Sequence, residues 1–393
     1  MKSKFRIKHI VNQICFQTAI PHYKRSIEAK AGLDGNTLTH VTYYACGNAG
    51  DTVLSECVRQ TFRLFDNNVG FHLFGVNEKV DSDTILKINL DMGVIIGGGG
   101  LFLPDTNENS ISGWQWAISK EQLNAIKKPI IVFSVGYNYF PGQIPSSLFI
   151  DNLNELIYHS QFVGLRNNGS VEAIKKLIDP SLHEKVVYQP CTTTIIDNIF
   201  PSDNHSKRNG KRIAVNMAFD RIEKRLGNNY EAKLSSIARA IKAIEDRGYQ
   251  IYYIAHCYED LRFIPYLEEA RVSYVAKDIS TWFPNKIIDM YRSIDMVIGM
   301  RGHAQMIPFG AGCKILTLGS HDKMRWFLED ICCLDWYIDL IQSKSIEEDI
   351  LKAFINIQEE NSNRTDLRLR TEREKLWEIT CDNMSTVTRI LAK

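Results

Sequence analysis

The sequence lacks three features that would each indicate a class of protein. No apolar run reaches the ~18 residues that a membrane-spanning helix needs. The formal net charge is only +1, without the basic excess that is typical of a general nucleic-acid binder. The apolar stretch after the basic start is interrupted by Asn12, Gln13 and Gln17, which argues against a secretory signal. We therefore expect neither a membrane-spanning, nor a nucleic-acid-binding, nor a secreted protein.

Paired cysteines and metal-binding patterns are also missing. The nine cysteines are odd in number and include neither a CxxC pair nor zinc-type spacing. This usage is typical of a reducing cytosol, so we expect a cytoplasmic protein. Because no cluster of carboxylates that would suit a hard cation appears either, we expect no metal and no cofactor.

The opening thirty residues are rich in Lys and Arg. Such a segment can lie against anionic lipid, which would give the protein a peripheral contact with the inner face of the membrane. A solvated basic surface is the simpler interpretation, and we favour it at this point.

What is present is an alternation of short β-branched runs with longer stretches of helical period, which predicts an α/β fold with parallel sheets. Expected strands lie at 40–45, 93–96, 129–135, 161–165 and 185–189, and after a polar linker (201–212) at 212–217, 249–255, 272–275, 295–299 and 314–318. Expected helices lie at 230–247, 258–270 and 284–293, with another after Arg301. We expect two Rossmann-like domains facing one another across a cleft, 1–204 and 205–344, and a helical segment at 345–393.

Ligands of open parallel sheets bind at the carboxyl ends of strands, and two glycine-containing junctions of this kind precede the linker. The first contains Gly47, Asn48, Gly50 and Asp51, ahead of a helix; a ligand contact and a helix cap by Asp51 are equally good interpretations. The second is the run of four glycines Gly97–Gly100 (Gly97, Gly98, Gly99 and Gly100), which follows a buried strand. Four glycines favour close approach of another group to the backbone, with a flexible crossing point as the alternative.

Cations stand at three further junctions. Arg166 follows a strand, and Ser170 opens the next helix as its expected N-cap. Arg301 and His303 lie between a buried strand and a helix closed by Gly312, and Lys323 follows the next strand. Guanidinium and ammonium groups beside helix amino ends favour a doubly charged anion, and a histidine there can transfer a proton. For an isolated arginine or histidine, a surface salt bridge or a packing role would be the simpler interpretation.

Taken in order, these elements resemble the polysaccharide pyruvyl transferase family from about Tyr43 to Phe327. The matching elements are Gly47-Asn48-x-Gly50-Asp51, the glycine run Gly97–Gly100, the pair Arg166 and Ser170, Arg301-x-His303, and Lys323. The resemblance implies a fold similar to that of two-domain GT-B glycosyltransferases. The chain departs from the family pattern at Asn167, where an acidic residue is usual, at Cys191, which follows Pro190 in place of an aspartate, and at Gly302, where leucine is usual.

The resemblance further implies transfer of the enolpyruvyl group of phosphoenolpyruvate to two hydroxyls of a sugar, giving a pyruvate ketal and phosphate. The implied acceptor is a surface polysaccharide or its lipid-linked precursor. Arg166, Ser170, Arg301 and Lys323 would bind the donor's phosphate and carboxylate, and His303 would be the acid that protonates its methylene carbon. Two alternatives stay open: a nucleotide-sugar glycosyltransferase of the same architecture, and a non-enzymatic protein that binds sugars or nucleotides.

Overall fold

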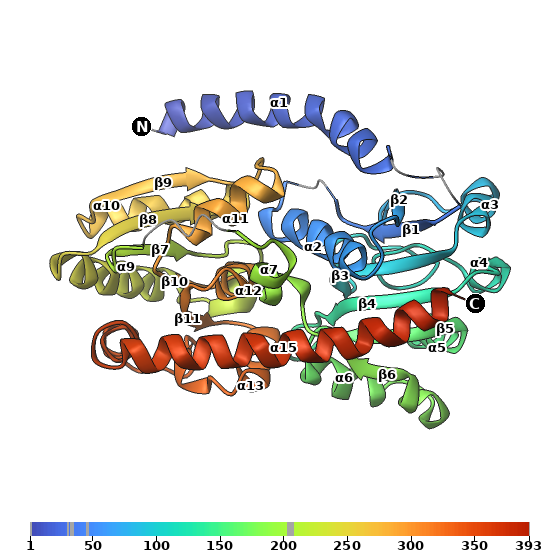
Figure 1. Cartoon of the computed structure of the whole chain (residues 1–393). Coiled ribbons are helices and arrows are strands. Elements are labelled where there is room, and N and C mark those ends of the chain that lie inside the picture. Colours follow the sequence, from blue (N-terminus) through green and yellow to red (C-terminus); the bar gives the residue numbers. More distant parts are fainter. Residues whose placement is uncertain (1, 30, 32–34, 45–46, 203–207, 393) are drawn as a thin grey trace. The chain divides into compact units, whose positions relative to one another are not determined.

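The computed structural model describes residues 2–29, 31, 35–44, 47–202 and 208–392, with the side chains of 2–8 excepted. It divides into two compact units. The N-terminal unit comprises Gln17–Cys46, Leu54–Thr192 and Leu376–Lys393, and the C-terminal unit comprises Met1–Phe16, Gly47–Val53 and Thr193–Lys375. The predicted boundary at 204/205 lies outside the described residues. Each unit contains one parallel sheet of six strands with flanking helices (Figure 1).

The sheet of the N-terminal unit has the strand order β2-β1-β3-β4-β5-β6. Its strands are β1 (Thr37–Thr42), β2 (Gly70–Gly75), β3 (Gly93–Phe102), β4 (Ile130–Tyr137), β5 (Ser160–Leu165) and β6 (Val186–Tyr188). Its shorter helices are α3 (Ser82–Leu90), α4 (Lys120–Ala125), α5 (Ser147–His159), α6 (Asn168–Lys175) and the 3₁₀ helix η1 (Pro180–Lys185). The central strands are almost entirely buried because helices cover a parallel sheet on both faces.

The sheet of the C-terminal unit has the order β12-β11-β10-β7-β8-β9. Its strands are β7 (Arg212–Asn216), β8 (Gln250–Ala255), β9 (Tyr274–Asp278), β10 (Met296–Gly299), β11 (Lys314–Gly319) and β12 (Tyr337–Asp339). Its helices are α7 (Ile196–Ile199), α8 (Ile222–Leu226), α9 (Tyr230–Asp246), α10 (Ile264–Glu269), α11 (Pro284–Arg292), α12 (His303–Gly310), α13 (Asp322–Asp330) and α14 (Ile346–Phe354). The 3₁₀ helices η2 (Thr192–Ile195), η3 (Tyr258–Phe263) and η4 (Leu334–Trp336) and the π-helix η5 (Ile355–Glu360) complete it.

Three long helices contribute residues to both units: α1 (Lys2–Glu28), α2 (Ala49–Phe65) and α15 (Ser362–Leu391). The predicted α/β class with C-terminal helices is confirmed. Among the helices in the described ranges, none combines the length and apolar character that crossing a membrane requires.

The structure corrects several expected boundaries. The strand predicted at 93–96 continues through all four glycines to Phe102. The helix predicted at 258–270 consists of η3 followed by α10. The sequence pattern did not reveal β2, β12 or the helix α1.

Candidate functional site

In the C-terminal unit, the strand order reverses between β7 and β10, which are neighbours in the sheet although four α-helices, one 3₁₀ helix and two strands separate them in sequence. Such a switch point is where open parallel sheets bind ligands. Asn216, the last residue of β7, joins the two strand ends: its Oδ1 accepts from the backbone N–H of Arg301 at 3.3 Å, and its Nδ2 donates to Ile254 O at 2.8 Å. The backbone of Arg301 is thus held at this switch point.

Arg301 lies against two aspartates rather than in open solvent. Its Nε and Nη2 donate to the two carboxylate oxygens of Asp260 at 2.8 and 2.7 Å, a bidentate arrangement. The Asp260 side chain is completely buried and also accepts from the backbone N–H of His256 and Cys257. Burial by itself would lower the pKa of Arg301, but Asp260, Cys257 and Asp220 together outweigh it and raise that pKa well above the ordinary value. Arg301 is therefore a fixed cation, two of whose three guanidinium nitrogens contact aspartates.

The second aspartate, Asp220, extends the cluster toward solvent. Its carboxylate oxygen lies 2.8 Å from Arg301 Nη2, and its other oxygen accepts from Arg225 Nη2 at 2.7 Å. Burial would raise the pKa of Asp220, but Arg301 and Arg225 outweigh it and hold that pKa well below its usual range. The two arginines and two aspartates balance one another in charge, so the cluster by itself is not a strongly cationic site.

His303 is the first residue of α12, and its side chain is only 12% exposed. Its Nδ1 lies 3.9 Å from Asp51 Oδ1, an ion-pair distance rather than a hydrogen bond. A Cβ added to Gly50 would lie 2.4 Å from His303 Nδ1, so the imidazole packs directly on the bare backbone of this glycine. Asn48 fixes the turn, because its Nδ2 donates to Asp51 Oδ2 at 2.8 Å and its Oδ1 accepts from Gly50 N.

The Gly47–Asp51 turn and the Arg301-x-His303 element therefore come together in one unit. Asn48, which immediately precedes α2, makes the local cap contact that was one of the two interpretations for Asp51. Asp51 instead faces the imidazole of His303.

Lys323 lies in the first turn of α13, after the strand β11 that neighbours β10. The N-cap of this helix is His321, whose Nδ1 accepts from the Lys323 backbone N–H at 3.3 Å. Gly302 lies close by: a Cβ added there would meet nothing nearer than Lys323 Cε at 3.8 Å. The amino ends of α12 and α13, which follow adjacent strands, thus both carry cationic side chains, as predicted.

In the N-terminal unit, the glycine run forms an irregular part of β3. Gly98 and Gly99 have φ of 73° and 133°, and the pairing register with β4 shifts after Gly99. β4 has its own irregularity at Ser134, whose φ is 57° and whose buried Oγ has no hydrogen-bond partner among the described residues. A Cβ added to Gly97 would lie 2.0 Å from Phe133 O. Close backbone packing therefore accounts for at least this glycine, without any ligand.

Arg166 and Ser170 lie beyond β5 in the same unit. Arg166 is 5% exposed, and its Nη2 donates to Asn138 Oδ1 at 2.6 Å. The N-cap of α6 is Asn167, whose side chain accepts from Ser170 N at 2.7 Å, so the predicted capping role of Ser170 is wrong. The Ser170 hydroxyl instead accepts from Tyr137 N at 3.1 Å, which ties the helix to β4. Asparagine is as good a cap as serine, and sequence spacing could not choose between them.

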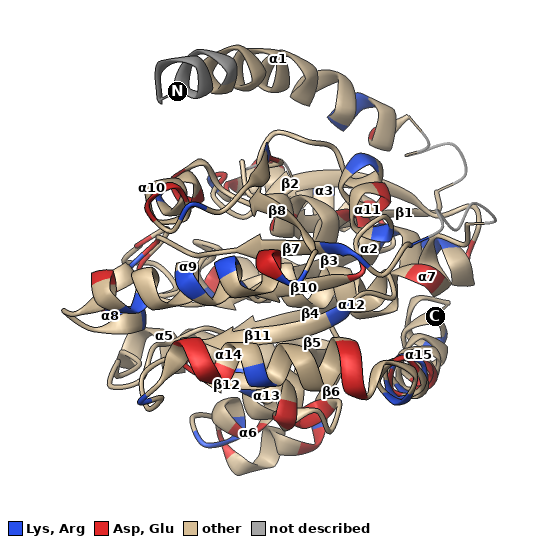
Figure 2. Cartoon of the chain, turned by 90° about the vertical axis from the view of Figure 1, so that its left-hand side faces the viewer, with Lys and Arg blue, Asp and Glu red and all other residues tan. Residues whose placement is uncertain are grey.

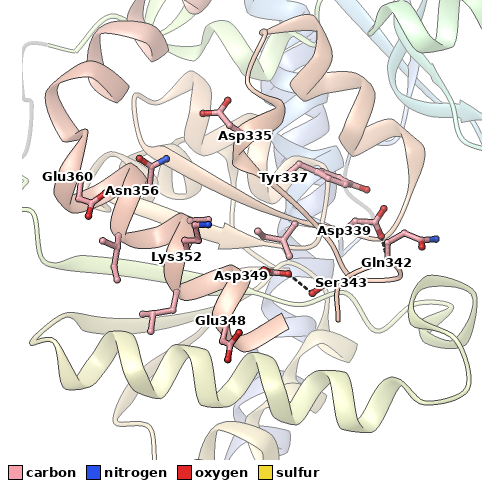
Figure 3. Close-up of a pocket in the computed structure, with 14 residues that line it drawn as sticks. Asp335, Tyr337, Asp339, Gln342, Ser343, Glu348, Asp349, Lys352, Asn356 and Glu360 are labelled. Atoms are coloured by element: carbon pink, nitrogen blue, oxygen red, sulfur yellow. Dashed lines mark hydrogen bonds between the residues drawn. The ribbon is translucent and has the colours of Figure 1, made fainter. Parts of the chain in front are cut away.

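A separate pocket of about 1070 Å³ lies beside β12, α14 and η5 in the C-terminal unit (Figure 3). Its charged lining residues are Asp335, Asp339, Glu348, Asp349, Lys352 and Glu360. Ser343 Oγ donates to Asp349 Oδ2 at 2.6 Å across one side of it. Five carboxylates against one lysine make this pocket unsuited to a phosphorylated ligand.

The sequence analysis missed two site residues, Asp260 and Asp220. Both follow strands of the same sheet, β8 and β7, so inspection of every strand end for carboxylates as well as for cations would have found them. Within the described part of the chain, no group of three or more His, Cys, Asp or Glu side chains is arranged to hold a metal ion.

Comparison with known families identifies one match. A family model described as polysaccharide pyruvyl transferase matches residues 48–322, which confirms the resemblance. That range contains both the Asn48–Asp51 turn and the Arg301–His303 element, and it ends one residue before Lys323. No curated protein matches the chain.

Solved structures match over most of the chain. The chain is similar to a glycosyltransferase from Rickettsia africae ESF-5, with a TM-score of 0.54 and 12% identity, over 91% of this chain and 99% of that one. It is also similar to a putative UDP-N-acetylglucosamine 2-epimerase from Listeria monocytogenes, with a TM-score of 0.53 and 10% identity, over 84% and 90% of the two chains. A third similar structure is a UDP-GlcNAc 2-epimerase from Neisseria meningitidis, with a TM-score of 0.52 and 10% identity, over 91% of this chain and 99% of that one. At these identities the likeness shows the fold alone, and the fold is GT-B-like.

Proposed function

Because the chain belongs to the polysaccharide pyruvyl transferase family, we propose that it transfers the enolpyruvyl group of phosphoenolpyruvate to a sugar of a surface polysaccharide or of its lipid-linked precursor. A proton added to the methylene carbon of the donor makes its C2 an oxocarbenium centre, which one sugar hydroxyl attacks. The second hydroxyl then replaces phosphate at C2, giving a pyruvate ketal and inorganic phosphate. Each attacking hydroxyl loses one proton. One of these two protons replaces the proton that the methylene carbon gained, and the other is released to the medium or to phosphate.

The observation that carries this proposal is the environment of His303. A partly buried imidazole stands at the amino end of α12, packed on Gly50 and 3.9 Å from the Asp51 carboxylate. The helix amino end disfavours a charged imidazole, whereas Asp51 and a bound dianion favour it. In the complex with phosphoenolpyruvate, His303 can therefore be a positioned acid, and we assign it the proton transfer to the methylene carbon.

Arg301 and Lys323 are the proposed anion ligands, and they contribute to anion binding in different ways. Two of the three guanidinium nitrogens of Arg301 already contact aspartates, so Arg301 presents Nη1 and a fixed positive charge. Lys323 and the amide groups at the amino ends of α12 and α13 supply the rest of the attraction. Arg166, Ser170 and the loops of Gly47 and Gly97–Gly100 stay predicted substrate contacts on the strength of the family resemblance.

Ligand-dependent thermal stability tests the donor. Phosphoenolpyruvate should raise the melting temperature, because a ligand that binds only the folded state stabilises it by mass action. Lys323→Ala should lose most of this shift, and Arg301→Lys should reduce it because an ammonium cannot replace the planar fork of Arg301. Lys344→Ala, which removes a lysine outside the cluster, is the matched control. Stabilisation by UDP-sugars in place of phosphoenolpyruvate would favour the glycosyltransferase alternative.

Release of phosphate in the presence of an acceptor sugar tests the role of His303. His303→Gln should fold and bind phosphoenolpyruvate but lose about 10²–10⁴ in turnover, the usual contribution of a positioned acid. A folded His303→Gln protein with near-native turnover would contradict the assignment. A variant that binds normally and turns over slowly would not be expected of a non-enzymatic binding protein.

We further propose that the reaction needs no metal and takes place in the cytoplasm, at or near the inner face of the membrane. Exhaustive chelation should leave phosphate release unchanged. Loss of activity on chelation and its recovery with Mg²⁺ or Mn²⁺ would contradict this part of the proposal and again favour a glycosyltransferase.

A further inference from the structure

The helix α1 has two faces of different character within the C-terminal unit. On the inner face, His9 Nδ1 lies 2.7 Å from Asp278 Oδ2 and the His9 ring stacks on Tyr258 with 3.8 Å between centroids. Phe16, only 2% exposed, packs against Phe283 with 5.5 Å between centroids. Two turns apart, these contacts fix which side of the helix is turned toward the unit.

The opposite face presents apolar side chains to solvent. Ile10, Val11 and Ile14 are 48%, 53% and 59% exposed, and Cys15 is exposed beside them. At 3.6 residues per turn the three branched side chains fall within an arc of about 100°, on the side away from Phe16. Exposed apolar residues are usually scattered singly, whereas three on one face of two successive turns form a continuous apolar strip.

Charge is distributed along α1 so that this strip is flanked by cations. Residues 9–23 contain no Asp, Glu, Lys or Arg, and Figure 2 shows the middle turns of α1 without charged residues. Lys2, Lys4, Arg6 and Lys8 precede the strip in sequence and Lys24 and Arg25 follow it, whereas the first acidic residue of the chain is Glu28. The first 27 residues therefore carry six Lys and Arg and no Asp or Glu.

We propose that the outer face of α1, formed by Ile10, Val11 and Ile14 with the cations at either end, binds an anionic lipid surface. An apolar strip enters the boundary between headgroups and acyl chains, and the Lys and Arg residues that precede and follow it in the sequence provide the positive charge that anionic headgroups attract. Each cation near such a surface adds attraction, and the absence of acidic residues in this segment removes repulsion. A protein partner with an apolar groove would not by itself account for cations at both ends of the strip.

This surface is distinct from the cluster around Arg301 and His303, and lipid binding is measured without donor or acceptor. The proposed reaction and the lipid surface can therefore fail separately. If both hold, the chain would work beside the membrane that carries a lipid-linked acceptor.

Sedimentation of the full chain with vesicles tests the proposal. Vesicles of phosphatidylcholine are compared with vesicles of one part phosphatidylglycerol to two parts phosphatidylcholine. We expect binding to the anionic vesicles at least about tenfold tighter, and weakened at ~1 M salt, where the Debye length is short. Ile10→Gln/Ile14→Gln should reduce binding about tenfold, because it removes apolar side chains that would enter the bilayer. Lys4→Ser/Lys8→Ser should reduce it about 10- to 30-fold.

The matched control is Leu86→Gln/Leu90→Gln, which changes two leucines on α3 that are 62% and 84% exposed. It should bind vesicles as the unchanged chain does. The proposal is wrong if the chain does not sediment with anionic vesicles, or if the α1 variants bind them as well as the control does. It is equally wrong if sedimentation without lipid shows a dimer that Ile10→Gln/Ile14→Gln abolishes, since the strip would then belong to an interface with a second copy.

Discussion

Each unit contains a buried arginine that pairs with a carboxylate, and the two arginines are held in different ways. In the C-terminal unit, Arg301 makes a bidentate ion pair with the Asp260 carboxylate and lies beside the partly exposed Asp220. In the N-terminal unit, Arg59 is fully buried and donates to Glu56 at 2.6 Å, to Ser55 at 2.7 Å and to Tyr23 at 3.1 Å.

The two networks support different kinds of surface. The Arg301 network continues to Asp220, which is partly exposed to solvent and also pairs with Arg225. The Arg59 network also continues into the interior of the unit, because Arg59 lies 3.4 Å from His40 Nδ1, and His40 Nε2 lies 2.9 Å from the backbone oxygen of Gly97. There a buried side chain supports the backbone of the glycine run. The Arg301 network thus holds charged side chains that are partly exposed, whereas the Arg59 network supports a stretch of main chain.

The largest expected effect is a loss of unfolding free energy when the carboxylate that pairs with Arg301 or with Arg59 is removed. Asp260→Ala leaves Arg301 buried without its bidentate partner and two backbone N–H groups without an acceptor, so it should cost about 3–5 kcal/mol of unfolding free energy. Glu56→Ala should cost at least about 1 kcal/mol less, because Glu56 is partly exposed and Arg59 keeps Ser55 and Tyr23. Urea unfolding of both variants checks this ranking. Equal losses would mean that the two networks contribute alike.

The next effect tests whether the glycine run is shaped by packing. Gly97→Ala would place a methyl group 2.0 Å from Phe133 O, a backbone atom that cannot move aside. We expect a loss of about 3 kcal/mol, at the upper end of the usual cost of overpacking. Gly302→Ala is the matched control, since it has helical dihedrals and open space around the added methyl group. If Gly97→Ala melts at the same temperature as Gly302→Ala, close packing does not explain this glycine.

A smaller change should affect activity in the C-terminal unit with little effect on folding. Gly50→Ala must displace the His303 side chain, because the new Cβ would lie 2.4 Å from Nδ1. Misplacing a catalytic group by about 1 Å can cost about 10²-fold in rate, so turnover should fall by up to that factor while phosphoenolpyruvate still raises the melting temperature. Full activity in Gly50→Ala would show that the position of the imidazole does not matter for the reaction.

The smallest effect is a pH dependence that both units share. Burial, followed by Arg59, lowers the pKa of His40 from 6.5 to about 3, and burial, followed by Arg301, lowers that of His256 to about 3. Above pH 6.5 neither imidazole binds a proton in either state. Below pH 6.5 these two histidines bind protons only in the unfolded chain. As the pH decreases, the unfolding free energy should therefore decrease by about 1 kcal/mol per pH unit for each histidine.

Urea unfolding between pH 5 and 6.5, above the range in which most carboxylates titrate, measures this slope. His40→Gln and His256→Gln should each make it shallower by about 1 kcal/mol per pH unit. A slope that neither buried-histidine variant alters would contradict the depressed pKa values.

Sequence periodicity located most of the elements but not all of them. The strands β4, β5, β7, β8, β10 and β11 stand within a few residues of their predicted places, because buried parallel strands are continuous apolar runs. The edge strand β2 was missed because its pattern is short and glycine-bounded, and β12 because it has three residues. The helix α1 was missed because apolar residues on both of its faces hide the helical period.

By itself, the sequence determined the α/β class, the family, and the strand ends at which Arg301, His303, Lys323 and the glycine run stand, because these depend on local order along the chain. Only the tertiary structure decided what those residues touch. Asp260 is 41 positions from Arg301, and Gly50 is more than two hundred from His303, so no local pattern reports either contact. The same fold turns Ile10, Val11 and Ile14 outward by anchoring His9 and Phe16. A contact between distant segments depends on how strands are ordered in the sheet, and that order is a property of the packed chain.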